Sequence, residues 1–194
     1  MSKLKLGFVS AVAAALLVGM ASQTAGASEA RPVFKAGYDF GGDTLVRVTF
    51  TNGQTDSIAA NEGFYLGGGV SIMNDERTVE TELTAAWKYA AIHATNGDVS
   101  FTRFPIEALL FWHEERFRVG GGLTYHLSPK LDGSGFASPI NFQFKDSAGF
   151  VVQADYKATE NIRFGIRYTA LKYGVAGSSS IDASGVGITF TGRF

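Results

Sequence analysis

The sequence predicts an all-β fold, an eight-stranded antiparallel up-and-down transmembrane β-barrel, and three observations carry this prediction. Apolar residues alternate with small or polar residues in one segment after another from Phe34 to the C-terminal Phe194, which is the pattern of amphipathic strands. The chain is 45% hydrophobic and 13% aromatic, yet beyond its N-terminal segment no apolar stretch is long enough for a membrane helix. Its 24 glycines and 4 prolines suit strands and turns. Because lipid leaves no partner for an open sheet edge, such a sheet must close into a barrel.

Residues 1–27 have the pattern of a cleavable export signal. Lys3 and Lys5 precede an apolar run from Leu6 to Met20, and Ala25-Gly26-Ala27 has the small-x-small form of a cleavage site. We expect cleavage after Ala27, which leaves residues 28–194 as a single barrel domain. The alternative is an uncleaved membrane helix, for which the apolar run is short of the ~20 residues that a span needs.

The alternation divides the mature chain into eight strands, an even number that brings both ends to one side. The expected strands are 33–40, 61–73, 78–91, 99–113, 115–128, 147–157, 161–173 and 182–194. The connections near 74–76, 114 and 158–160 are short, and those at 41–60, 129–146 and 174–181 are longer. Short periplasmic turns and longer outer loops are the expected asymmetry of a bacterial outer-membrane barrel.

Each strand has one apolar and one polar face. The apolar faces carry bulky residues such as Phe34, Trp87 and Trp112, and suit hydrocarbon, whereas the polar faces suit a lumen. The charged residues assigned to the lumen are Lys35, Asp39, Glu80, Glu82, Lys88, Arg103, Glu107, Arg116, Arg118, Asp155, Lys157, Arg163, Arg167 and Arg193. An eight-stranded barrel has room for side chains and little else, and an isolated buried ion is very costly. We therefore expect a salt-bridge network that plugs the lumen; the alternative is a narrow path for ions or solutes through a positive interior.

A further hairpin is expected at about residues 44–59, in the first outer loop. Val46, Val48 and Phe50 alternate up to Asn52-Gly53, a dipeptide that favours a two-residue hairpin turn. We place this hairpin outside the barrel wall or folded over its mouth.

Composition excludes several functions. The chain has no cysteine, so a disulfide, a thiolate metal site and a lipid-bearing cysteine are all impossible, and no cofactor or metal is expected. Loss of Lys3 and Lys5 changes the net charge from 17 − 18 = −1 to 15 − 18 = −3, and no basic patch favours nucleic acid.

The main rival fold is a secreted lipocalin-like barrel. Bulky aromatics on the apolar face and modest charge on the other favour the membrane form.

The C-terminal strand carries a resemblance to known proteins. Ile188, Phe190 and the terminal Phe194 recur at even spacing, and the mature chain resembles the small eight-stranded outer-membrane proteins related to OmpX and the OmpA transmembrane domain. This resemblance implies a Gram-negative outer-membrane location among lipid and lipopolysaccharide. It also implies recognition by the barrel-assembly machinery, with Phe190 and Phe194 as the assembly signal, and it implies no enzymatic activity.

One pair of residues has the form of a catalytic site. His126 and Ser128 are two residues apart and are expected on one face of a strand, where the imidazole could activate the hydroxyl. The pair resembles the His-x-Ser of the outer-membrane lipid A 3-O-deacylase. Pro129 follows, however, and removes a backbone N–H that could help to hold an oxyanion. We expect a hydrogen-bonding pair at a strand end. A lipid A deacylase-like hydrolase is the third-ranked function, behind a structural or surface-interaction role and a pore or carrier.

The third outer loop is the expected place for an interaction. It carries Leu131, Phe136, Ile140, Phe142 and Phe144 among glycines and serines, so it must bury apolar surface against the barrel mouth, lipid or a partner. We expect a non-enzymatic barrel with a structural, surface-interaction or envelope-maintenance role. The alternative is a narrow pore or a carrier of small hydrophobic molecules.

Overall fold

The computed structural model describes residues 29–50, 53–175, 177 and 180–194. The expected signal peptide therefore lies outside the described residues. Within them, no helix is long and apolar enough to cross a membrane.

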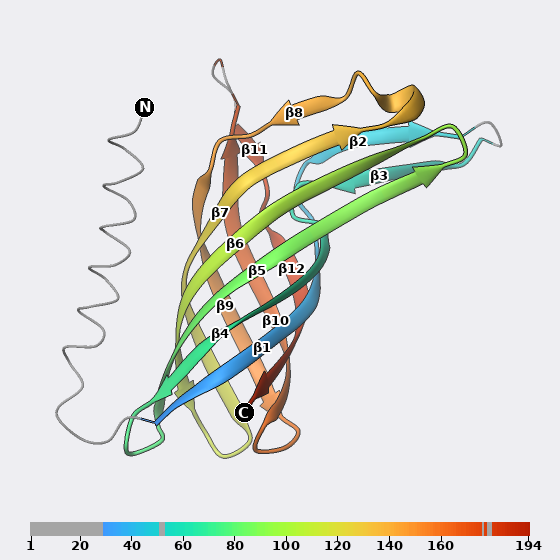
Figure 1. Cartoon of the computed structure of the whole chain (residues 1–194). Helices are drawn as coiled ribbons and strands as arrows, with labels where there is room; N and C mark the ends of the chain where they lie inside the picture. The colour runs from blue at the N-terminus through green and yellow to red at the C-terminus, as the bar shows by residue number, and fades with distance from the viewer. Residues whose placement is uncertain (1–28, 51–52, 176, 178–179) are drawn as a thin grey trace.

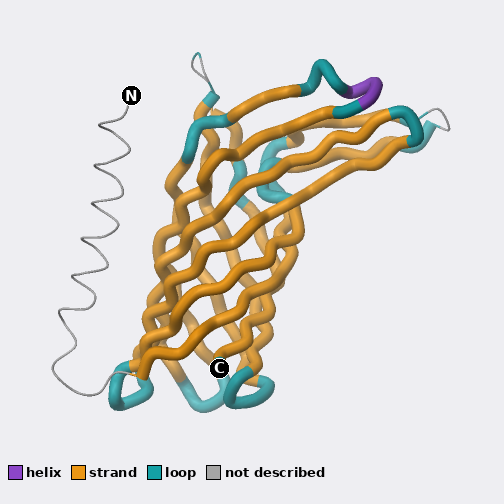
Figure 2. The backbone as a smooth tube through the Cα atoms, viewed as in Figure 1, coloured by secondary structure: helices purple, strands orange, loops and turns teal. Residues whose placement is uncertain are grey.

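Eight long strands close into an antiparallel barrel (Figures 1 and 2). They are β1 (Glu29–Phe40), β4 (Gly63–Met73), β5 (Val79–Ala94), β6 (Gly97–His113), β7 (Phe117–Gly133), β9 (Ser147–Lys157), β10 (Ile162–Gly174) and β12 (Gly185–Arg193). Each pairs with the next, and β12 pairs with β1 to close the ring, with Gly37 opposite Thr189. The predicted all-β, eight-stranded fold is confirmed.

The three short turns and both ends of the barrel chain lie at one end, which we call the turn end (Figure 2). In the first turn, the side-chain oxygen of Asn74 accepts hydrogen bonds from the backbone N–H groups of Thr78 and Val79, both at 2.9 Å. The longer connections lie at the opposite, loop end. This is the asymmetry that the sequence predicts.

At the loop end, β5, β6 and β7 run past the predicted strand ends and lean away from the barrel (Figure 1). Together with β2 (Thr44–Thr49), β3 (Thr55–Ala59), a 3-10 helix η1 (Gly135–Ala137), β8 (Asn141–Gln143) and β11 (Ser180–Asp182), they form what we call the loop-end lobe. The hairpin β2–β3 is a separate two-stranded sheet, outside the barrel wall.

The lobe has an apolar core of its own. Its buried residues are Ile58, Ala60, Ala90, Ile92, Val99, Phe101, Leu131, Phe144, Leu171, Tyr173 and Ala183. The ring of Phe101 lies edge-on to the rings of Phe144 and Tyr173, with centroids 5.7 and 5.9 Å apart.

Polar contacts also connect the segments of the lobe. The Asp43 carboxylate accepts a hydrogen bond from the Asp182 N–H at 2.8 Å. Hydrogen bonds from Ser184 lower the pKa of the Asp182 carboxyl group. The segments that the sequence places in outer loops thus pack against one another over the barrel mouth.

The barrel wall is polar inside and apolar outside. Large outward side chains such as Leu110 and Ile166 are 55% and 68% exposed, whereas inward side chains such as Lys35 and Arg118 are buried. This arrangement is the reverse of a water-soluble barrel, which needs a polar exterior. The outward apolar residues form a belt around a transmembrane barrel.

Candidate functional site

The lumen gathers the charged residues that the sequence assigns to it, with two exceptions. The buried residues are Lys35, Asp39, Glu80, Glu82, Lys88, Arg103, Glu107, Arg118, Asp155, Arg163, Arg167 and Arg193. Arg116 is exposed in the turn before β7, and Lys157 donates from its Nζ to the carbonyl of Glu114 at 2.8 Å at the same turn. The predicted lumen position of these two residues is wrong, because the strand alternation stops at the turn. The lumen therefore contains 9 − 2 = 7 basic and five acidic residues.

Arg118 organises the half of the lumen near the turn end. Its Nε donates to Asp155 Oδ2 at 2.6 Å, and its Nη1 donates to Glu80 Oε2 at 2.9 Å and Glu82 Oε2 at 3.0 Å. The guanidinium also lies 3.9 Å from the ring centroid of Phe111. Such a planar cation with several donors suits a buried multiple ion pair. All three carboxylates thereby gain a partner that offsets the cost of their burial.

The half near the loop end contains a second group of ion pairs, in which Arg167 Nε also lies 3.9 Å from Asp39 Oδ1. Lys88 Nζ donates to Asp39 Oδ2 at 2.5 Å, and Arg167 is paired with Glu107. Lys35 Nζ lies 2.7 Å from Glu82 Oε1 and 3.5 Å from Glu107 Oε2, so it joins the two halves.

Arg103 differs from the other buried cations. Its side chain is 0% exposed, and no carboxylate of the described residues lies within salt-bridge distance. Its Nη2 instead donates to the backbone carbonyls of Asn61, at 2.8 Å, and Glu62. The guanidinium lies 4.2 Å from the ring centroid of Phe101 in the lobe core. Arg103 therefore attaches the segment between β3 and β4 to the barrel mouth.

Little space remains between these side chains. A polar cavity of about 10 Å³ lies among residues that include Lys88, Glu107 and Arg167, which is room for about one water molecule. Leu109, Phe111 and Val151 add a small apolar cluster to the lumen. The interior is packed with side chains, as expected for an eight-stranded barrel.

The structure separates His126 from Ser128. His126 is buried, and its Nδ1 lies 2.6 Å from the hydroxyl oxygen of Tyr173. Ser128 is exposed, has a φ of 48°, and its N–H donates to Asp146 Oδ1 at 2.8 Å. The β6–β7 register shifts beside it, between Thr102 and Phe104. The predicted shared face of the two residues is wrong, because this irregularity breaks the alternation between them.

The apolar residues of the third loop pack mainly within the lobe. Leu131 and Phe144 are buried, and Ile140 packs against the same core. The Phe142 ring lies 4.8 Å from that of Phe144 and is partly exposed. Only Phe136, in η1, is largely exposed, at 85%. Most of the apolar residues of this loop are thus buried within the protein itself.

The two residues of the expected assembly signal lie on and beyond the last strand. The Phe190 ring faces outward and packs against that of Phe164, with centroids 5.4 Å apart. Phe194 is exposed, and its N–H donates to the carbonyl of Pro32 at 3.0 Å. Their role in assembly stays a prediction.

Sequence reasoning missed three contributors to the lumen. Asn61 Oδ1 accepts a 3.0 Å hydrogen bond from Lys88, His113 Nε2 lies 2.6 Å from Glu80 Oε2, and Tyr173 pairs with His126. Asn61 precedes β4 in the structure, although the sequence predicts a strand from residue 61, and alternation does not identify its partner. Among the described residues, no group of three or more His, Cys, Asp or Glu residues could hold a metal ion.

Comparison with known proteins places this fold. No protein-family model matches the chain, and no curated protein matches it by sequence. Among solved structures, Ail of Yersinia pestis, in complex with the heparin analogue sucrose octasulfate, has a TM-score of 0.51 at 13% identity, covering 86% of this chain and 99% of Ail. Neisserial surface protein A has a TM-score of 0.49 at 11% identity, covering 87% and 100%. The chain has the fold of the small eight-stranded outer-membrane barrels.

Proposed function

We propose that this protein is a non-conducting barrel of the Gram-negative outer membrane with a structural, surface-interaction or envelope-maintenance role. The observation that carries the proposal is the filled lumen. Twelve buried charged side chains occupy it, and the lobe core lies over the mouth. In the outer membrane, the short turns would face the periplasm and the loop-end lobe would face the cell exterior. Lipid and lipopolysaccharide would surround the protein. The barrel-assembly machinery would recognise the C-terminal strand.

Conductance distinguishes this proposal from the narrow pore. In planar bilayers we expect no discrete openings from the purified full chain, because ion pairs block the lumen and moving an ion through them would expose buried charge. A 16-stranded porin, which has an aqueous channel, serves as the positive control in the same bilayers. Discrete, reproducible openings of the wild-type protein would favour the pore instead.

The absence of hydrolase activity is a second part of the proposal. General-base activation needs the histidine within hydrogen-bond reach of the serine hydroxyl, whereas His126 contacts Tyr173 and Ser128 is exposed. After incubation with lipopolysaccharide, mass spectrometry is expected to find no acyl loss. The hydrolase would be supported by acyl loss that disappears in Ser128→Ala.

Charge limits the kind of surface partner. Segments 41–62, 90–102, 127–148 and 170–184 contain seven acidic residues, Asp43, Asp56, Glu62, Asp98, Asp132, Asp146 and Asp182, but only four basic residues, Arg47, Lys130, Lys145 and Lys172. Ail was solved with a sulfated heparin analogue. The acidic excess in these segments of the present chain disfavours a polyanionic partner.

A further inference from the structure

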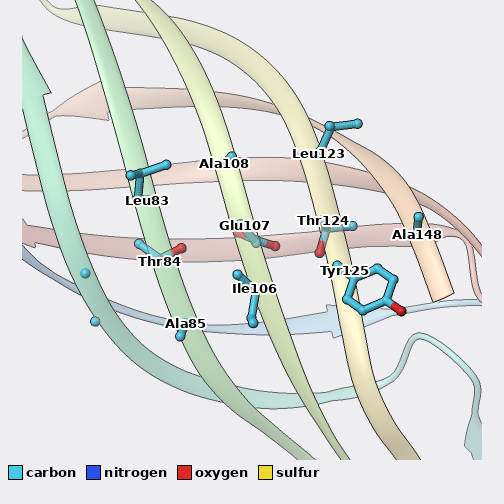
Figure 3. A pocket seen from close by; sticks show the side chains of 12 residues that line it. Leu83, Thr84, Ala85, Ile106, Glu107, Ala108, Leu123, Thr124, Tyr125 and Ala148 are labelled. Carbon is cyan, nitrogen blue, oxygen red and sulfur yellow. The ribbon is translucent and has the colours of Figure 1, made fainter. Parts of the chain in front are cut away.

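The outward wall of the barrel has a hollow of about 320 Å³ (Figure 3). Its floor contains four small residues from four strands, and larger apolar side chains lie between them. The small residues are Gly68, Ala85, Ala108 and Ala148, and the larger ones are Leu83, Ile106, Leu123 and Tyr125.

The hollow results from the register of the sheet. Gly68 pairs with Ala85, Ala85 with Ile106, Ile106 with Tyr125, and Tyr125 with Ala148. Gly68 and Ala85 are thus adjacent, whereas Ile106 and Tyr125 lie between Ala85 and Ala148. Ala108 lies in another row, between Leu83 and Leu123. Neighbouring outward positions are large, as at Leu110 and Phe150.

The hollow offers an occupant almost no polar group. The side chains of Thr84, Glu107 and Thr124 also line it but are buried, which leaves the hydroxyl of Tyr125 as the other polar side-chain group of the lining. Glu107 is already paired with Arg167 in the lumen. An apolar occupant therefore fits the hollow, and a charged or strongly polar one does not.

The surroundings of the hollow identify the occupant. It is continuous with the exposed apolar belt, which includes Leu66, Phe104 and Leu110. On β5, the stacked rings of Trp87 and Tyr89, 5.2 Å apart, lie towards the loop end from Ala85, as aromatic residues do at a membrane interface. A hydrocarbon chain that hangs from the headgroup layer would pass directly into the hollow.

We propose that this hollow holds one acyl chain of a membrane lipid as a resident ligand. The inference rests on the proposed membrane location. Lipid already surrounds the belt, so transfer from water contributes nothing to specific retention. What retains the chain is van der Waals contact, since an unfilled hollow leaves its lining without partner atoms on one side. A flexible acyl chain would fill the hollow and restore those contacts.

The test is native mass spectrometry of the full chain, extracted from membranes in a mild detergent. The wild-type protein is expected to retain one lipid, whose mass distinguishes a phospholipid from a lipopolysaccharide. Ala108→Phe fills the floor and should reduce the retained fraction about tenfold. Leu110→Phe enlarges a neighbouring side chain on the same face of β6, outside the hollow, and should leave retention unchanged. Ala85→Leu fills the floor from another strand and replaces Ala108→Phe if that variant does not fold.

Three results would overturn the proposal. They are wild-type protein without lipid, equal lipid retention in the filling variants (Ala108→Phe or Ala85→Leu) and in Leu110→Phe, or a dimer that is lost when the floor is filled. The last would assign the hollow to a second copy of the chain. Failure of the membrane location itself gives a different result, a wild-type chain that stays monomeric and soluble in water without detergent.

Discussion

Two inward-facing glycines leave the room that two lumen carboxylates occupy. A Cβ atom at Gly187 would lie 1.8 Å from Asp39 Oδ1, and one at Gly165 would lie 1.8 Å from Asp155 Oδ1. The polar faces are rich in glycine because a narrow lumen holds long charged side chains only where the residue paired with them on the neighbouring strand has no side chain. Glycine and charge are therefore two parts of one packing arrangement.

Gly187→Ala should destabilise the barrel by about 3 kcal/mol or more. The added methyl group would displace the Asp39 carboxylate and leave Lys88 buried without its partner. Urea unfolding in lipid vesicles measures the loss. Gly174→Ala is the matched control, because its Cβ would meet only the flexible Lys145 side chain, at 3.3 Å. Equal unfolding midpoints for the two variants would refute this account of the glycines.

At the same scale, alternation identified the buried lumen charges but not their partners. It failed at Arg116 and Ser128, where a turn and a shift in register interrupt the regular strand. A period of two predicts the face of a residue only within uninterrupted strand. The His126–Tyr173 contact joins residues 47 positions apart, and nothing local in the sequence indicates it.

At the scale of elements, the loop-end lobe is the main addition to the predicted fold. The sequence predicts the eight wall strands and the 44–59 hairpin, but it ends the strands of β5 and β7 earlier than the structure does. The apolar residues beyond those predicted ends find their partners in β3 and β10 and at Phe144, which directly follows β8. The extended strands are stable because they share one core, a property that no single segment has alone.

Phe101→Ala should loosen the lobe while the barrel stays closed. Truncating a fully buried phenylalanine costs about 3–5 kcal/mol, and Phe101 contacts both Phe144 and Tyr173. Limited proteolysis in vesicles should then cut the 134–146 segment faster. Phe136→Ala makes the same change at an exposed site and should behave as wild type. Identical cleavage rates in the two variants would show that the lobe core does not hold the loops.

At the scale of the whole molecule, the closed ring and the apolar belt predict the behaviour of the purified protein. Every wall strand is paired on both sides, and large apolar side chains cover the outside. The folded protein should need detergent or lipid, and it should migrate differently in gel electrophoresis before and after boiling. A urea-unfolded sample provides the reference for the boiled form. A water-soluble chain with one unchanging mobility would contradict the membrane barrel.

The sequence by itself determined the class of fold, the number of wall strands and the face on which most charges lie. Those features follow from a local period of two and from the chemistry of each face, so neighbouring residues suffice to read them. Only the tertiary structure decided which ions pair, how the loops cap the mouth, and where small residues combine into a hollow. These features join distant positions, such as Lys35 and Glu107, which are 72 residues apart, and they exist only once the strand register has brought those positions together.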